Sequence, residues 1–385
     1  MMKTQRTSLV LFCILAVLAF LPMVQEHLNW PHVKALAGVQ KEVPFPQLNI
    51  TTYRNGQFQK GLELYLQHHY GYRPNTLRLY NQYLWDCYHK TYVKYSIKEG
   101  KEGWLYEPWF VEDYYHGGTY SQKKDSLTLA RELEQEALRI HQLQSALERH
   151  GITLLVCQAP GKDAVYPEYL PDNAVPHRPK ILSARDFYEE QFERLGVNHI
   201  NMEQWFLQMK DTVDFLLFPQ KGTHWSNIAA VYAADSIFRY IEAKQGFRMN
   251  HLVIGKPTVG PFKKPDYDLE ELYNLQRPLK KLPQHYVELS VKKVPGAVKP
   301  KLITVGDSYF WNISRQVPMD SLFEAYPYLY YNNSLYYDTV RRPIEEFNLA
   351  KELMSADAVM LIYSSTQLYK MSNDFCRQAL IEINE

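Results

Sequence analysis

This sequence has almost no net charge, few cysteines and no internal repeat. Its 385 residues carry 43 basic and 42 acidic side chains, so the formal net charge is only +1 and no global field favours nucleic acid as a partner. The four cysteines include no CxxC pair and no histidine–cysteine cluster at zinc spacing. We therefore expect no disulfide framework, no metal site, no cofactor and no nucleic-acid partner.

The amino-terminal residues predict export. Lys3 and Arg6 precede an almost unbroken apolar run over Leu9–Val24, which suits a signal-type segment. Positive charge on the amino-terminal side places that end in the cytoplasm and the rest of the chain outside it. The nearest small-residue pattern, at 35–37, lies well beyond the apolar run, which favours an uncleaved anchor. We predict that residues 1–28 form a single anchor in the inner (cytoplasmic) membrane, with the remainder in the periplasm or outside the cell.

Beyond the anchor, the pattern predicts a linker and helical/hairpin module over 29–123, followed by one large domain over 124–385. In that domain amphipathic helices alternate with short apolar strands, which indicates an α/β fold with a mainly parallel sheet and helices on both faces. The expected helices span about 126–150, 179–195, 226–246 and 344–354, and the expected strands about 152–160, 197–202, 301–306 and 355–365. The span of about 249–297 is rich in proline and lysine with little periodicity, so we interpret it as an insertion.

Three motifs follow predicted strands or precede predicted helices, where reactive groups of open α/β sheets gather. In VGDSYF, Gly306 permits a tight turn after the strand, and Ser308 lies at the start of the next helix, where backbone N–H groups hold a developing oxyanion. In GTHWS, His224 precedes a helix and is a candidate general base. The alternative for Ser308 is a turn that only caps a helix, and the alternative for His224 is a histidine that forms local hydrogen bonds at the helix start.

The third motif, PGKD, places Lys162 and Asp163 after the first strand. Lys162 is a candidate to bind an anionic or carbonyl oxygen, although a solvated surface lysine is the commoner case. The expected oxyanion and substrate-binding residues are therefore Lys162, Gly306, Tyr309 beside the serine, and Trp225 beside the histidine.

The linked order of the blocks YLQHHYGYR, GWLY, PGKDAVYPEYLP, GTHWS and GDSYF resembles the alginate O-acetyltransferase AlgJ/AlgX family from about Phe45 to Leu368. That resemblance implies a circularly permuted SGNH-hydrolase-like domain. It also implies that Ser308 is the nucleophile and His224 its base.

One position departs from the family pattern. Alginate members of the family carry an aspartate two residues before the histidine, where this chain has Gly222. The imidazole then needs another orienting group, for which Asp163, Asp214 and a backbone carbonyl are the candidates. Asp307, next to the serine, is interpreted as a turn former.

The resemblance implies transfer of an acetyl group through acetyl-Ser308 to hydroxyls of an exported polysaccharide. It also implies a membrane-bound O-acyltransferase as the acetyl donor, because acetyl-CoA is cytoplasmic. Two alternatives remain open at this point: a polysaccharide acetyl esterase, and a non-catalytic carbohydrate-binding assembly protein, which the glycine at 222 favours.

Overall fold

The structure is a computed structural model that describes residues 2–38, 42–91, 97–116, 125–172 and 183–384. Its contacts divide the chain into two compact units. One comprises 1–95 together with 270–280, and the other comprises 96–269 together with 281–385. The second unit contains the central sheet and every residue of the site described below.

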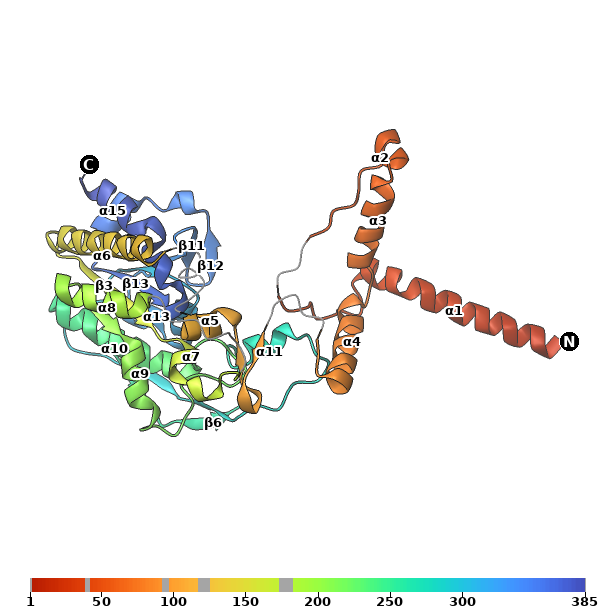
Figure 1. Ribbon diagram of the computed structural model, residues 1–385, viewed down its shortest axis with the longest axis horizontal. Coiled ribbons are helices and arrows are strands. Elements are labelled where there is room, and N and C mark those ends of the chain that lie inside the picture. The colour runs from red at the N-terminus through yellow and green to blue at the C-terminus, as the bar shows by residue number, and fades with distance from the viewer. Residues whose placement is uncertain (1, 39–41, 92–96, 117–124, 173–182, 385) are drawn as a thin grey trace. The chain divides into compact units, whose positions relative to one another are not determined.

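Seven of the described strands form one sheet, in the order β12–β11–β10–β9–β13–β3–β4. Figure 1 labels β3, β13, β11 and β12 of this sheet. In that order their bounds are Val340–Arg342, Ser334–Tyr337, Tyr328–Tyr330, Leu302–Gly306, Ala358–Ser364, Thr153–Ala159 and His199–Asn201. Strands β10, β9, β13, β3 and β4 run parallel, whereas β11 and β12 add an antiparallel edge. The predicted mainly parallel sheet is confirmed.

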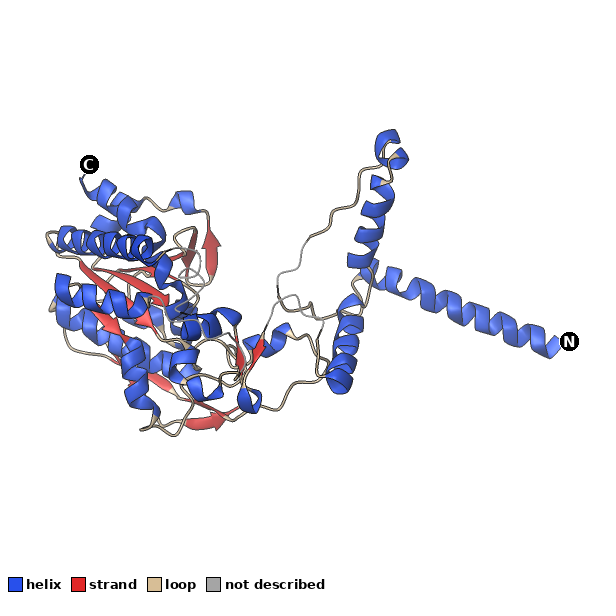
Figure 2. Ribbon diagram, viewed as in Figure 1, coloured by secondary structure: helices blue, strands red, loops and turns tan. Residues whose placement is uncertain are grey.

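Helices cover both faces of this sheet (Figure 2). Successive residues of the buried strands point to opposite sides, so both faces present apolar side chains that the helices remove from water. On β3, Leu155 and Cys157 pack on one side with α10 (Asn227–Gln245) and α12 (Tyr309–Gln316). Leu154 and Val156 pack on the other side. The helices there are α6 (Ser126–Glu148), α8 (Ala184–Leu195) and α15 (Phe375–Asn384).

The helix boundaries follow from local signals that the sequence displays. Asp125 caps α6 by accepting from the Thr128 N–H at 2.9 Å, and Ser226 caps α10 as predicted. Gly246 ends α10 in the left-handed conformation (φ 72°). The first residues of the helix predicted over 179–195 lie outside the described residues, and α8 begins at Ala184.

Shorter elements surround the sheet in the same unit. The hairpin strands β1 (Lys98–Glu99) and β2 (Leu105–Tyr106) pair antiparallel. The short helices are α5 (Pro108–His116), α7 (Lys162–Val165), α9 (Met202–Lys210), α13 (Met319–Leu322), α14 (Leu349–Met354) and the 3₁₀ segment η4 (Ser365–Asp374). All four cysteines are free thiols, and Cys157 is buried in β3.

The span predicted as an insertion, 249–297, contains two antiparallel strand pairs. Strand β5 (His251–Ile254) pairs with β8 (Leu289–Lys292), and β6 (Thr258–Gly260) pairs with β7 (Gln284–Tyr286). In chain order the short helix α11 (Asp268–Leu272) lies between β6 and β7. Its first residue, Asp268, extends this span to the site.

The other unit holds the amino-terminal helices α1 (Met2–Leu28), α2 (Ile50–Arg54), α3 (Gln57–His68) and α4 (Arg73–Tyr88). The stretch Thr7–Leu28 is apolar and exposed, and its 22 residues span about 33 Å at 1.5 Å per residue, enough to cross a bilayer. A signal sequence near the N-terminus meets the same criteria of length and apolar composition. Within this unit Asn81 of α4 donates to the Tyr273 carbonyl at 3.0 Å, which fixes the 270–280 segment against α4.

Candidate active site

The turn after β9 positions Ser308. Gly306 ends the strand so close to β13 that a Cβ there would lie 2.2 Å from the Ile362 carbonyl oxygen, so only glycine fits. Ser308 follows two residues later with helical backbone angles, as the first residue before α12. The hydroxyl therefore lies at the carboxyl edge of the parallel strands, beside a helix N-terminus.

Asp307 fixes this turn to the neighbouring strand. Its carboxylate accepts from the N–H and the hydroxyl of Ser364, at 2.7 and 2.6 Å, and from the N–H of Tyr309 at 3.0 Å. Ser364 is the last residue of β13. Burial raises the pKa of Asp307, although these hydrogen bonds oppose the shift. Asp307 thus joins the ends of β9 and β13, in keeping with its interpretation as a turn former.

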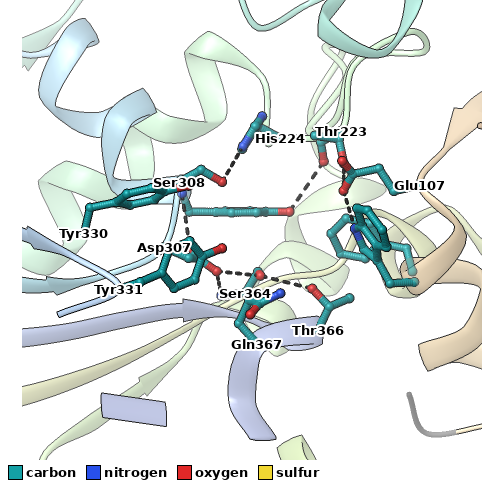
Figure 3. A pocket seen from close by; sticks show the side chains of 13 residues that line it. Glu107, Thr223, His224, Asp307, Ser308, Tyr330, Tyr331, Ser364, Thr366 and Gln367 are labelled. Atoms are coloured by element: carbon teal, nitrogen blue, oxygen red, sulfur yellow. Dashed lines mark hydrogen bonds between the residues drawn. The ribbon is translucent and has the colours of Figure 1, made fainter. Parts of the chain in front are cut away.

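Ser308 and His224 meet at this edge although 84 positions separate them (Figure 3). The distance from Nε2 of His224 to Oγ of Ser308 is 2.8 Å. The other ring nitrogen, Nδ1, lies 2.6 Å from Oδ2 of Asp268. A carboxylate, an imidazole and a hydroxyl are therefore connected in the order that activates a serine nucleophile.

The carboxylate of Asp268 is itself held in place. Its Oδ1 accepts from the backbone N–H of Thr223, the residue before His224, at 2.8 Å. Two residues earlier, Asp266 anchors the loop by accepting from the Asn227 side chain at 3.1 Å and from the Tyr286 hydroxyl. These contacts fix the 263–268 loop against α10 and β7.

Gly222 provides the space for that loop. A Cβ at this position would lie 2.2 Å from the Pro265 carbonyl oxygen and 3.2 Å from Oδ1 of Asp268. The loop that carries Asp268 thus occupies the volume that a side chain at 222 would need. Gly222, where alginate members of the family carry an aspartate, therefore lies next to Asp268, whose carboxylate contacts His224.

The orienting carboxylate therefore differs from both predicted candidates. Asp214 is exposed in the loop after α9. Asp163 is buried in α7, where burial holds its pKa well above the usual range and its Oδ1 has no hydrogen-bond partner among the described residues. The hydrogen bond to Nδ1 of His224 comes from Asp268 instead.

Lys162 also departs from its predicted role. Its ammonium is fully buried and donates to three backbone carbonyls, with burial lowering its pKa. The acceptors are the oxygens of Leu105 (2.7 Å), Gln220 (3.1 Å) and Gly222 (2.7 Å). Lys162 therefore binds the chain just before His224 to β2 and has no donor left for a substrate.

The two predicted aromatic residues differ in position. Trp225 is completely buried in the core, with its ring centroid 5.1 Å from that of Tyr309. Tyr309 is also buried, but it lines the cavity next to Ser308, and its ring centroid lies 5.3 Å from that of His224. Trp225 thus packs against Tyr309 without lining the cavity, whereas Tyr309 forms part of the cavity wall.

Burial and charge together set the basicity of His224. Burial disfavours the imidazolium, but the hydrogen bond and the negative charge of Asp268 outweigh it. Glu107 and Asp307 add smaller contributions, so the pKa of His224 is raised above its usual range. The same arrangement favours the imidazolium that a proton transfer from Ser308 creates.

A cavity of about 230 Å³ opens beside Ser308 and His224. Its described lining includes the carboxylates of Glu107 and Asp307 and contains no lysine or arginine. Aromatic rings, hydroxyls and the amide of Gln367 complete the wall. Among the described residues, no group of three or more histidine, cysteine or carboxylate side chains is arranged to hold a metal ion.

Sequence reasoning missed Asp268, Glu107 and Gln367. The empty acid position at 222 was the one signal that a carboxylate had to arrive from elsewhere. The segment PDYDLEEL offers several acidic side chains in a row, and their sequence does not say which of them faces the histidine.

The sheet and the groups at its carboxyl edge define an SGNH-like α/β fold. The sequence profile of the family described as "SGNH hydrolase-like domain, acetyltransferase AlgX" matches residues 97–309, more than half of the chain. The chain belongs to this family, and the predicted family and fold class are confirmed.

Several solved structures are similar to this chain. The O-acetyltransferase domain of Pseudomonas putida AlgJ is 18% identical over 75% of this chain and 99% of its own, with a TM-score of 0.47. Pseudomonas aeruginosa AlgX is 14% identical over 74% of this chain and 67% of its own, with a TM-score of 0.43. Bacillus cereus PatB1 is 13% identical over 71% of this chain and 97% of its own, with a TM-score of 0.41. A search of the curated proteins found no match.

Proposed function

We propose that this protein is an extracytoplasmic serine O-acetyltransferase that moves an acetyl group through acetyl-Ser308 onto a hydroxyl of an exported polysaccharide. One observation carries the proposal: the hydrogen-bonded series Asp268–His224–Ser308 beside an open cavity, in a chain of an acetyltransferase family.

In the first half-reaction Oγ of Ser308 attacks the carbonyl carbon of the acetyl donor while Nε2 of His224 takes the hydroxyl proton. Asp268 stabilises the imidazolium and keeps the ring in the required tautomer. The proposed oxyanion donors are the backbone N–H of Ser308, at the start of α12, and the side-chain amide of Gln367 in the cavity wall. The imidazolium then gives its proton to the leaving group.

In the second half-reaction a sugar hydroxyl attacks the acetyl-serine ester. His224 accepts the proton of that hydroxyl and returns it to Oγ of Ser308 as the ester bond to the enzyme breaks. The products are an O-acetylated sugar and the free serine. Water is the competing acceptor, so a transferase must bind its sugar well enough to exclude water.

The proposed donor is a membrane-bound O-acyltransferase that passes acetyl groups across the inner membrane. The apolar helix over Thr7–Leu28 would hold the catalytic unit at that membrane and raise its effective concentration near the donor. The family resemblance and this helix support the placement.

A non-catalytic carbohydrate-binding protein is the less favoured function. Its main support was the missing acid at 222, and Asp268 supplies a carboxylate to His224 from another part of the chain. An acetyl esterase uses the same three residues, so the acceptor alone separates it from the proposed transferase.

Mass spectrometry of the full chain in detergent after incubation with p-nitrophenyl acetate tests the proposal. We expect an acetyl adduct on Ser308 that is absent from Ser308→Ala and His224→Ala. Ser314→Ala, which removes another hydroxyl of α12, should retain the adduct. An adduct on a different residue, or equal ester turnover in all variants, would contradict the proposed nucleophile.

A further inference from the structure

Glu107 lines the same cavity on the side away from Ser308 and has one oxygen without a donor (Figure 3). Its Oε2 accepts from Nε1 of Trp109 at 2.6 Å and from Oγ1 of Thr223 at 3.0 Å. No described residue donates a hydrogen bond to Oε1. The carboxylate is thus fixed in orientation through one oxygen while the other remains available to a ligand.

A half-buried carboxylate with an unused acceptor favours a ligand that donates hydrogen bonds. Sugar hydroxyls and ammonium groups do so, whereas a second carboxylate does not. The hydrogen bond from Nε1 to Glu107 also fixes the indole of Trp109, which is 46% exposed. Its ring and those of Tyr330 and Tyr331, which also line the cavity, provide aromatic surface of the kind that packs against a pyranose.

The charge of the cavity adds a constraint on the acceptor. Glu107 and Asp307 line it, Asp268 lies directly behind His224, and its described lining has no lysine or arginine. A uronic acid would bring a further carboxylate into a partly desolvated space that the carboxyl groups of Glu107 and Asp307 already line. Like charges brought together in this way oppose binding strongly.

We propose that Glu107 and Trp109 form the acceptor subsite, and that this subsite takes a neutral or amino sugar in preference to a uronic acid. A hydroxyl or ammonium group of the sugar donates to Oε1 of Glu107, the ring packs against Trp109, and another hydroxyl is thereby held for attack on acetyl-Ser308. The inference rests on the proposed acetyl transfer and adds its acceptor class.

The experiment is a partition assay with the full chain in detergent and p-nitrophenyl acetate as donor. Cellopentaose, a chitosan pentamer and a mannuronate pentamer serve as neutral, cationic and anionic acceptors. Released acetate reports hydrolysis, and mass spectrometry of the oligosaccharide reports transfer. We expect transfer to either cellopentaose or the chitosan pentamer, whichever is the better acceptor, to exceed transfer to the mannuronate pentamer by about tenfold or more. This factor corresponds to a difference of one charge-assisted hydrogen bond between the acceptors.

Glu107→Gln is the discriminating variant, because it conserves size and keeps an oxygen for Trp109 and Thr223 while replacing Oε1 by an amide donor. We expect the acceptor KM for the neutral or amino sugar to rise about tenfold and the ratio of transfer to hydrolysis to fall by a similar factor. Trp109→Ala should lower that ratio as well. Glu345→Gln, which removes an exposed charge outside the cavity, is the matched control.

The outcomes separate three cases. If Glu107 acts only through its charge on His224, Glu107→Gln shifts the pH midpoint of acylation and leaves the partition ratio unchanged, which overturns the subsite. Preference of the wild-type protein for mannuronate, or transfer to none of the three acceptors while acetyl-Ser308 forms, overturns the acceptor class and leaves the acyl-enzyme intact. Absence of acetyl-Ser308 itself overturns the proposed function and the subsite with it.

Discussion

Oδ2 of Asp268 lies 2.6 Å from Nδ1 of His224, although 44 positions separate the two residues. The chain therefore provides its histidine with a carboxylate without using the position two residues earlier, where alginate members of the family carry an aspartate. The loop that brings Asp268 to this place runs through the space left by Gly222. The glycine and the aspartate are thus two parts of one arrangement.

Replacing this carboxylate should slow acylation of Ser308 severely. Asp268→Asn keeps the shape of the side chain but removes the charge that fixes the tautomer and stabilises the imidazolium. We expect kcat/KM for p-nitrophenyl acetate to fall by about 10³-fold or more. Asp214→Asn, which alters an exposed aspartate, should match the wild-type protein. Equal activity of Asp268→Asn and wild type would show that His224 needs no carboxylate.

The pH dependence of ester turnover should report the raised pKa of His224. Only the neutral imidazole accepts the Ser308 proton, so the rate falls as pH drops through that pKa. Because Asp268 and neighbouring charges raise the pKa, the acid midpoint of kcat/KM should lie above the ordinary histidine value of about 6.5. In Asp268→Asn the midpoint should move to lower pH while the plateau falls. A midpoint that stays in place would contradict the assigned base.

Position 222 should tolerate no side chain. Gly222→Ala places a Cβ against the Pro265 carbonyl oxygen, a backbone atom that cannot move without displacing Asp268. We expect lower thermal stability and lower ester turnover, measured by differential scanning fluorimetry and p-nitrophenyl acetate assays.

The double variant Gly222→Asp/Asp268→Asn gives the sharper result, because it restores the family's acid position while removing Asp268. We expect no rescue of activity. Recovery to the wild-type rate would show that the 263–268 loop moves easily and that the acid position is interchangeable.

Lys162 should matter for stability rather than for substrate. Lys162→Met leaves three buried carbonyls without their donor, and we expect the free energy of unfolding to fall by roughly 2–4 kcal/mol. Urea unfolding followed by tryptophan fluorescence measures the loss. Lys256→Met, at an exposed lysine, provides the comparison. A stable Lys162→Met with a raised substrate KM would instead favour the ligand-binding role that the sequence suggested.

Much of the fold follows from signals that are local in the sequence. The helices α6 and α10 and the strands β3, β9 and β13 match their predicted ranges to within a few residues, because apolar periodicity, capping residues and glycine stops act over a few neighbouring positions. The 249–297 span lacked such a pattern. Its two-stranded pairings join segments tens of residues apart, which no local window reveals.

For the site, the sequence by itself determined the motifs of Ser308 and His224, since each lies at a strand end or helix start that the chain encodes locally. Only the tertiary structure decided that Asp268 is the partner of His224, that Lys162 is bound by backbone carbonyls, and that Glu107 faces the cavity. Each of these depends on contacts between segments that are far apart in the chain. For Asp268, close packing in the space beside Gly222 sets the position of its loop.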